Sequence, residues 1–329
     1  MTDADANNPC PICASEKTKF LFDSWDFEYG YPGTFPLWQC RDCRHIYLIG
    51  NFTPEMLTDM YSLYYPRAEI DVEQYKPLPE RTGFLSWLDG DSAGCHRWVP
   101  KNVRVLDIGC GCCEALGYHK SRGCEVWGSD ADENVQKIAD RYGFHVHIGL
   151  FDADNYEKNY FDYVTIDQVF EHFTEPERIL QQVFTILKPG GKLIIGMPNA
   201  QSIDRFLFGR LWSGWHTPYH LHLFSKQSAA LLLKKTGYLC ESAQCKVPAV
   251  NLLTQWGLLF VHGKQGEPMH FRPPPRLGTL DSFGSGLECL WYIRLYRFLE
   301  KTRAFALPVR FADALGIGMN RIYIASKPS

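Results

Sequence analysis

Four cysteines near the N-terminus are spaced like the ligands of a metal ion. Cys10 and Cys13 form one Cys-x-x-Cys pair, Cys40 and Cys43 form a second, and 26 residues separate the two pairs. Four thiolates suit tetrahedral zinc, and a site closed by four protein ligands keeps no coordination position for a substrate. Four unrelated buried thiols or a redox pair are the alternatives. We predict a structural zinc site, with His45 as its neighbour.

A glycine-rich turn follows a buried strand in the middle of the chain. Residues 105–111 read Val-Leu-Asp-Ile-Gly-Cys-Gly, and the apolar run 103–108 is typical of a parallel strand. Gly109 and Gly111 allow the backbone to approach a ligand at the N-terminus of the next helix. Asp130 ends the following strand, where a carboxylate can accept hydrogen bonds from ribose hydroxyls. These residues predict a nucleotide-binding domain.

Strand and helix patterns alternate around this turn. The predicted strands are 103–108, 125–129, 145–148, 163–167 and 192–196. One helix is predicted between the cap Thr174 and the Pro-Gly-Gly at 189–191, and another begins at the cap Ser225 and ends at Gly237. The segments 238–247 and 321–326 are strand candidates that would close the sheet. This order predicts an α/β fold with a doubly wound parallel sheet, whose ligands bind at the carboxyl ends of the strands.

Composition and charge exclude several classes of protein. The chain has 329 residues, of which 45% are hydrophobic, and its formal net charge is -3. No run of lysine and arginine follows one face, so nucleic acid is not expected as a partner. Residues 1–8 are acidic and polar without a signal-peptide pattern, so the twelve cysteines favour a reducing cytoplasm. The longest apolar stretch, 252–261, is shorter than the roughly 18 residues of a membrane span.

The chain divides into five predicted segments. These are a zinc-binding ribbon (1–50), a helical linker that covers the cofactor site (51–100), a core (101–247), an insert (248–318) and a final core strand (319–329). In the insert, apolar residues recur at helical spacing from Leu287 to Leu299. Core or homodimer packing is one interpretation of them. A lid with a hydrophobic acceptor channel, or contact with a membrane surface, is the other.

Several motifs then resemble one enzyme family. They are Asp-Ile-Gly-Cys-Gly (107–111), Gly-Ser-Asp (128–130), Phe-Asp-Tyr-Val (161–164), Glu-His-Phe (171–173) and Leu-Lys-Pro-Gly-Gly-Lys-Leu (187–193). In this order they resemble class I S-adenosylmethionine-dependent methyltransferases, which implies a Rossmann-like fold and S-adenosylmethionine as cofactor. Pro-Asn (198–199), Gly-Arg-Leu-Trp (209–212) and Pro-Tyr-His-Leu-His-Leu-Phe-Ser (218–225) resemble a bacterial subgroup related to ubiquinone-type methyltransferases. Its members often carry an N-terminal cysteine ribbon.

The resemblance assigns the cofactor-binding residues. Asp107 would order the turn formed by Gly109, Cys110 and Gly111, and Asp130 with Ala131 would bind the ribose. Leu150 and Phe151 would sandwich the adenine, Asp152 would accept from its amine, and Gln168 would lie near the methionine portion. The chain departs from many relatives at Cys113, where they have a small residue. The full set is Asp107, Gly109, Cys110, Gly111, Asp130, Ala131, Leu150, Phe151, Asp152 and Gln168.

Histidines are the candidates for the general base. Imidazole titrates near neutral pH, so His172, His216, His220 and His222 could each take a proton from a hydroxyl, although a structural role is the alternative for each. His172 follows the fourth strand at the cofactor mouth. In an extended segment His220 and His222 would share a face, so periodicity does not choose between them. We predict His220 and His172 as catalytic residues.

These features predict methyl transfer to a small-molecule acceptor, on a hydroxyl group of a sugar, lipid or secondary-metabolite intermediate. The acceptor would lie between the cofactor mouth, residues 216–222 and the insert. Two alternatives stay open: RNA methylation with recognition by the zinc ribbon, and a non-catalytic, zinc-dependent interaction protein. The absence of a basic face disfavours RNA. The intact Asp107, Gly109, Gly111 and Asp130 disfavour a non-catalytic role.

Overall fold

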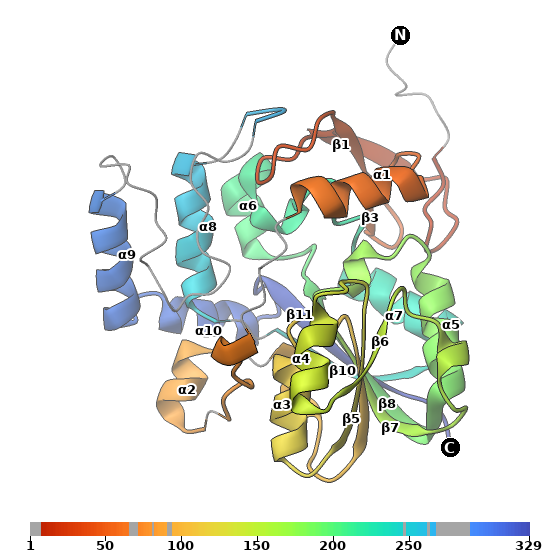
Figure 1. Ribbon diagram of the computed structural model, residues 1–329. Helices are drawn as coiled ribbons and strands as arrows, with labels where there is room; N and C mark the ends of the chain where they lie inside the picture. The colour runs from red at the N-terminus through yellow and green to blue at the C-terminus, as the bar shows by residue number, and fades with distance from the viewer. Residues whose placement is uncertain are drawn as a thin grey trace.

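A seven-stranded mixed sheet is the centre of the computed structural model (Figure 1), which describes residues 8–65, 72–80, 82–90, 94–245, 248–261, 264–267 and 290–329. Its strand order is β10-β11-β8-β7-β4-β5-β6. Five strands run parallel: β4 (Arg104–Ile108), β5 (Glu125–Asp130), β6 (His145–Ile148), β7 (Phe161–Asp167) and β8 (Leu187–Pro198). The last two, β10 (Leu239–Cys245) and β11 (Asn320–Ser326), are antiparallel. The predicted α/β sheet is therefore confirmed, with an antiparallel edge.

Helices cover both faces of this sheet, because successive strand residues point to opposite faces. Val105 belongs to a core that includes Leu116 and Ile138, whereas the next residue, Leu106, belongs to a core that includes Leu180 and residues of α7. The helices concerned are α3 (Glu114–Ser121) and α4 (Val135–Tyr142) on one side, and α5 (Pro176–Ile186) and α7 (Lys226–Lys235) on the other. Apolar residues on both faces explain why the strands read as continuous hydrophobic runs.

Two helix boundaries differ from the predictions, and one agrees. Thr174 does not cap α5: the helix begins at Pro176 after Glu175, which makes no side-chain cap hydrogen bond. α5 ends at Ile186, and β8 starts at Leu187, so the Pro-Gly-Gly stretch lies inside the strand, where its pairing with β7 is irregular. Ser225 caps α7 as predicted, because its hydroxyl accepts the backbone N–H of Ser228.

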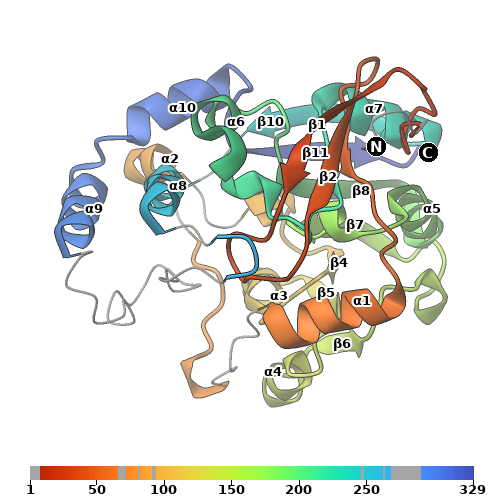
Figure 2. The ribbon, with the colours of Figure 1, turned by 90° about the horizontal axis from the view of Figure 1, so that it is seen from above.

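A second, smaller sheet contains the N-terminal residues. β1 (Thr18–Ser24), β2 (Phe35–Cys40) and β3 (Ile46–Leu48) pair in order, and β9 (His222–Leu223) from the middle of the chain adds a fourth strand. α1 (Pro54–Asp59) continues into a π-helical turn, Met60–Tyr64. Figure 1 and Figure 2 show this sheet and α1 over one end of the central sheet. We call residues 8–48 the N-terminal module.

The remaining helices lie to one side of the central sheet (Figure 2). They are α2 (Phe84–Asp89), α6 (Ile203–Phe208), α8 (Val250–Val261), α9 (Leu290–Thr302) and α10 (Ala306–Ala314). Short 3-10 turns lie between the helices and strands, at Val72–Gln74, Gly94–Trp98, Ala153–Asn155, Phe170–His172, Gly209–Leu211 and Ser213–Trp215. Leu287 of the predicted apolar pattern lies outside the described residues. Among the described helices, none has the length and apolar character needed to cross a membrane.

Candidate functional site: a cysteine cluster, a glycine turn and a buried histidine cluster

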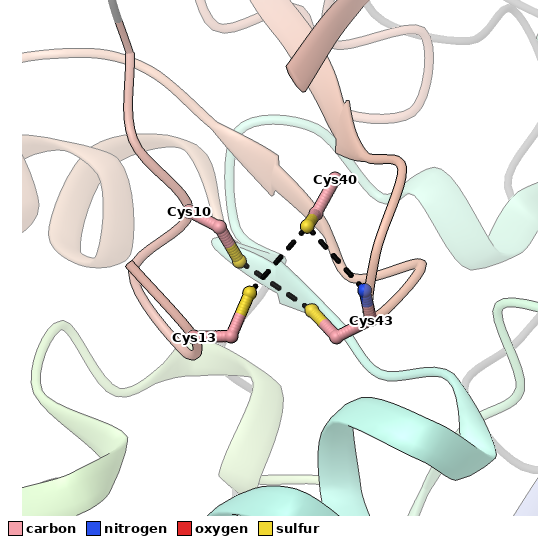
Figure 3. Close-up of side chains that lie close together, drawn as sticks. All are labelled: Cys10, Cys13, Cys40 and Cys43. Carbon is pink, nitrogen blue, oxygen red and sulfur yellow. Dashed lines mark hydrogen bonds between the residues drawn. The ribbon is translucent and has the colours of Figure 1, made fainter. Parts of the chain in front are cut away.

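The four predicted cysteine ligands converge at the edge of the N-terminal module (Figure 3). The Sγ atoms of Cys10 and Cys43 are 3.5 Å apart, as are those of Cys13 and Cys40, and all four sulfurs lie within 4.8 Å of one another. Zinc–sulfur bonds of about 2.3 Å in a tetrahedron place sulfurs about 3.8 Å apart. The four thiols therefore fit zinc in spacing and in donor type.

Backbone turns hold each cysteine pair in place. Ala14 donates its N–H to the Cys10 carbonyl over 2.8 Å, and Cys10 donates to the Ser15 carbonyl over 2.9 Å. In the second pair the backbone N–H of Cys43 points at the Cys40 sulfur, 3.4 Å away. An N–H group aimed at a sulfur stabilises a thiolate there, as a metal ligand requires.

The glycine turn follows β4 in the chain and is hydrogen-bonded to the end of β5. Gly109 has φ +77°, and a Cβ at this position would lie 2.3 Å from a methyl carbon of Val169, so any other residue would strain the backbone and require Val169 to move. The N–H groups of Gly109 and Cys110 both donate to the Ser129 carbonyl, over 2.7 and 3.1 Å. Gly111 also has a positive φ, of +49°, but its Cβ position is open.

Asp130 anchors this turn through its side chain. One carboxylate oxygen accepts the N–H of Gly111 over 2.7 Å, and the other accepts the N–H of Asp132 over 2.9 Å. It is not a helix cap, because α4 begins at Val135 after Asn134. Ala131, beside it, is exposed. Asp130 thus lies at the carboxyl end of β5, where the sequence predicts the ribose.

Asp107 is buried near the turn, and Asp167 at the end of the neighbouring strand is partly buried. Asp107 is 3% exposed and accepts a hydrogen bond from the Thr165 hydroxyl over 2.7 Å, and burial raises its pKa to about 7. Asp167 ends β7, and burial raises its pKa as well. A Cβ at Gly94 or Gly196 would come within about 2 Å of Asp167 oxygens, so two glycines make room for this carboxylate. Sequence reasoning missed Asp167.

The predicted adenine-site residues face different surroundings. Leu150 is 82% exposed, whereas Phe151 is 8% exposed and packs with its ring against Tyr156. Asp152 accepts the N–H of Asp154 over 3.1 Å. Gln168 follows β7 with φ +56° and donates its N–H to the Gly196 carbonyl. These roles stay predictions.

Cys113, where the family resemblance leads us to expect a small residue, fits the turn without an exposed thiol. It precedes α3 in the left-handed conformation, with φ +58°, and its side chain is fully buried. The thiol joins the core between the sheet and α3. Cys110 is likewise buried, so both cysteines contribute packing to the turn.

Three of the four candidate histidines form one cluster. The ring of His220 lies 4.8 Å from that of His172 and 4.7 Å from that of His216. His220 Nε2 is 3.3 Å from His216 Nδ1, and its Nδ1 is 2.9 Å from the Gly214 carbonyl. His172 Nδ1 is 2.9 Å from the Tyr219 carbonyl. Residues 216–220 form a tight turn, so the extended geometry considered from the sequence is not found there.

His222 leaves this cluster and contacts the N-terminal module. Its Nδ1 lies 3.0 Å from Nε2 of His45, and both rings are buried. The tertiary structure thus separates His220 from His222, which periodicity could not do. Because His222 contacts His45 instead of His172, His172 and His220 are the predicted pair that the structure brings together.

Glu171 is a buried member of the cluster that sequence reasoning did not select. It is fully buried, one of its oxygens lies 3.7 Å from His220 Nε2, and neither oxygen has a hydrogen-bond partner among the described residues. Burial raises the pKa of Glu171 to about 8. The Glu-His-Phe motif contains it, but nothing in that pattern shows that the carboxyl is buried.

Burial has the opposite effect on the histidines. It lowers the pKa of His172 to about 4 and that of His216 to about 3. Burial and the neighbouring His216 lower the pKa of His220 well below its ordinary value. At neutral pH the cluster therefore combines neutral imidazoles with a carboxyl group that still holds its proton to a large extent.

Tyrosines surround the histidine cluster from two other parts of the chain. Tyr61 and Tyr65 come from the π-helical turn and its end, and Tyr29 comes from the N-terminal module. Each of their rings lies 5.2 to 5.5 Å from that of Tyr219. The Tyr61 hydroxyl is 3.0 Å from His172 Nδ1. The tyrosine rings and the imidazoles therefore pack together near the carboxyl end of β7.

Comparisons with known proteins indicate the family of this chain. A family model described as a methyltransferase domain matches residues 76–243, which are 168 of the 329 residues. Ubiquinone biosynthesis O-methyltransferase of Azoarcus sp. (strain BH72) is 29% identical over 143 residues, 41% of this chain and 58% of that protein. Ubiquinone/menaquinone biosynthesis C-methyltransferase of Bordetella parapertussis is 32% identical over 149 residues, 37% of this chain and 58% of that protein.

Among solved structures, phosphoethanolamine N-methyltransferase 2 of Haemonchus contortus, in complex with S-adenosyl-L-methionine, has 17% identity and a TM-score of 0.49. The match covers 86% of this chain and 62% of that one. The chain spans less than two thirds of the length of the two curated relatives. The family model covers half of the chain, including the glycine turn and most of the central sheet. The chain therefore belongs to the methyltransferase domain family, among the class I S-adenosylmethionine-dependent methyltransferases related to the ubiquinone type.

Proposed function

We propose that this protein transfers a methyl group from S-adenosylmethionine to a hydroxyl group of a small-molecule acceptor. The observation that carries the proposal is the glycine turn, which is held by Asp130 at the carboxyl ends of β4 and β5, beside a histidine cluster. Ligands of doubly wound sheets bind at this end. The names of the relatives include both an O-methyltransferase and a C-methyltransferase, and both act in the biosynthesis of small molecules.

The chemistry asks the protein mainly to position two ligands. Methyl transfer from a sulfonium is an in-line displacement, so bringing donor and acceptor to near-attack distance provides much of the acceleration. In this proposal the turn Gly109 to Gly111 receives the methionine end, Asp130 and Ala131 the ribose, and Leu150 to Asp152 the adenine. Gln168 faces the methionine portion. Asp107 holds the turn from below.

Proton removal from the acceptor hydroxyl is the second task. His172 and His220 are the groups that we propose for this step. Their rings lie side by side, and in the chain His172 follows β7 while His220 follows Tyr219. Their lowered pKa values make both imidazoles weaker bases than an ordinary histidine. Glu171, 3.7 Å from His220, would stabilise the imidazolium that forms once its own proton is lost, because an ionised carboxylate favours the charged ring and a neutral carboxyl does not.

Zinc is the metal that we propose for Cys10, Cys13, Cys40 and Cys43. Four thiolates close its coordination shell, so the ion would supply folding energy to the N-terminal module and no open position for chemistry. The four cysteines form a group separate from the histidine cluster, and the spacing of their sulfurs fits the ion. The metal is therefore assigned a structural role.

The insert carries the remaining proposals. In α8 the Gln255 side chain accepts the N–H of Ser213 over 2.6 Å and donates to the Leu211 carbonyl over 2.8 Å, so the insert is attached next to the loop that bears His216. Leu307, Phe311 and Leu315 of the α10 region are each more than half exposed. We propose a lid or interface role for residues 248–318, with a homodimer and a membrane surface as the alternatives, in a cytoplasmic protein.

A binding and transfer experiment tests the function. Calorimetry with S-adenosylmethionine should show one site per chain, and radiolabelled cofactor should pass its methyl group to hydroxyl compounds in a screen of sugars, lipids and secondary metabolites. Mass spectrometry of the product distinguishes O-methylation from C- or N-methylation. A folded protein that does not bind the cofactor would exclude the proposal. Transfer to RNA in preference to every small molecule would favour the alternative.

A further inference from the structure

The N-terminal module and the core share a sheet, and the shared strand belongs to the histidine-bearing loop. β9 pairs with β3 through Ile46 with Leu223 and Tyr47 with His222. The pairing continues where Leu48 donates its N–H to the Leu221 carbonyl over 3.1 Å. Residues 216–225, which we call the histidine loop, thus have their second half built into the module.

Ser225 ties the end of this loop to a cysteine knuckle. Its hydroxyl donates to the carbonyl of Cys43 over 2.7 Å. The same hydroxyl accepts the N–H of Ser228 over 3.0 Å and so caps the N-terminus of α7. Ser225 is fully buried. One side chain therefore connects a proposed metal ligand, the end of the histidine loop and the first turn of α7.

His45 makes a second link two residues after the same knuckle. Its Nε2 is 3.0 Å from His222 Nδ1, and both rings are buried. A hydrogen bond between the two rings needs an N–H on one nitrogen and a lone pair on the other. The pair therefore fixes the orientation of both rings.

The module also contacts the beginning of the histidine loop. Asp26 accepts three backbone N–H groups of residues 28–31, which shapes the segment that carries Glu28 and Tyr29. The Tyr29 ring lies 5.5 Å from that of His216, and a Glu28 oxygen lies 3.7 Å from His216 Nε2. Both ends of the loop therefore depend on the module.

We propose that the four-cysteine cluster positions the histidine loop: metal binding fixes Cys43 and His45, and these hold Ser225 and His222. His45 and Ser225 are thus positioning residues for His220. The catalytic meaning of this coupling rests on the proposed function, whereas the coupling itself is a property of the fold. The connection is short, because only one hydrogen bond separates the cysteine knuckle from the loop on each path.

Hydrogen–deuterium exchange on the full chain tests the coupling. Zinc-loaded protein is compared with protein treated with a chelator. We expect backbone protection in residues 216–225 to fall by about tenfold or more together with that of residues 37–48, while β4 and β5 keep theirs. Affinity for S-adenosylmethionine, measured in parallel, should change by less than about twofold. Loss of protection confined to residues 8–48 would overturn the proposal, as would a chain that holds no zinc after expression with zinc.

Two substitutions test the links in zinc-loaded protein, in case the metal-free chain unfolds. Ser225→Ala and His45→Leu should each raise exchange in the histidine loop without loss of zinc. Ser228→Ala is the matched control for Ser225→Ala, because it removes the other hydroxyl of the cap and leaves the bond to Cys43. Wild-type exchange in both zinc-loaded variants would refute the coupling. None of these measurements needs methyl transfer, so they separate this proposal from the proposed function.

Discussion

Single carboxylates decide the chemistry of the cofactor turn. Asp130 holds Gly111 through a 2.7 Å hydrogen bond and offers its charge at the place where ribose is expected. Asp130→Ala should weaken S-adenosylmethionine binding by about tenfold or more, because each charge-assisted hydrogen bond contributes roughly 1.5 to 3 kcal/mol. Calorimetry measures the change. The exposed neighbour Glu133 provides the control, since Glu133→Ala removes the same charge and should leave affinity unchanged.

Glu171 gives the histidine cluster a pH dependence of known sign. Its pKa is about 8 in the folded chain, against the ordinary 4.5 of an unfolded one. The folded state therefore keeps a proton that the unfolded state has lost, and stability from this group falls as pH rises from 4.5 to 8. Glu171→Gln should be more stable relative to the wild type at pH 8 than at pH 5, by on the order of 3 kcal/mol. Urea unfolding at both pH values measures it, and an equal difference at both would contradict the assignment.

The two histidines after β7 are tested by turnover. His220→Ala and His172→Ala should each leave cofactor affinity intact, because neither ring belongs to the glycine turn. The variant that removes the base should lose turnover by roughly a hundredfold or more. Its rate should also lose the pH dependence of the wild type. Normal turnover in both variants would show that the base lies elsewhere or that the acceptor ionises unaided.

At the scale of an element, the turn between β4 and α3 depends on two glycines to different degrees. Gly109→Ala would strain a φ of +77° and bring the new methyl group 2.3 Å from Val169. Gly111→Ala meets a φ of +49° but open space. We expect a loss of about 1 kcal/mol for Gly111→Ala and clearly more for Gly109→Ala, with a parallel loss of cofactor affinity. Thermal unfolding and calorimetry compare them, and equal losses would show that the contact with Val169 relaxes.

The strands show why elements could be predicted well. Buried parallel strands are short apolar runs, so the segments 103–108 and 163–167 were visible in the sequence, and both are strands in the structure. The cap of α7 at Ser225 was visible for a similar local reason. Thr174 was wrong as a cap, because Glu175 and Pro176 place the first turn of α5 one residue later and no side chain satisfies it.

At the scale of the whole molecule, metal and fold are coupled. Cys40→Ser should lower the zinc content from one ion per chain and destabilise the N-terminal module, because the ligands are brought together only in the folded state. Elemental analysis gives the zinc content, and thermal unfolding gives the stability. Cys240→Ser, an exposed cysteine on β10, is the matched control and should keep its zinc. Full zinc occupancy in Cys40→Ser, or none in the wild type, would contradict the site.

The sequence by itself determined the cysteine pairs, the glycine turn and the alternation of strands and helices, because these depend on spacing and on neighbouring residues. The tertiary structure alone decided which histidine belongs to which site. His220 and His222 are two residues apart, yet one contacts His172 and the other His45, because β9 joins the N-terminal module just after a tight turn. It also decided the state of Glu171, since a carboxyl pKa depends on burial by segments distant in the chain, and no local pattern records that burial.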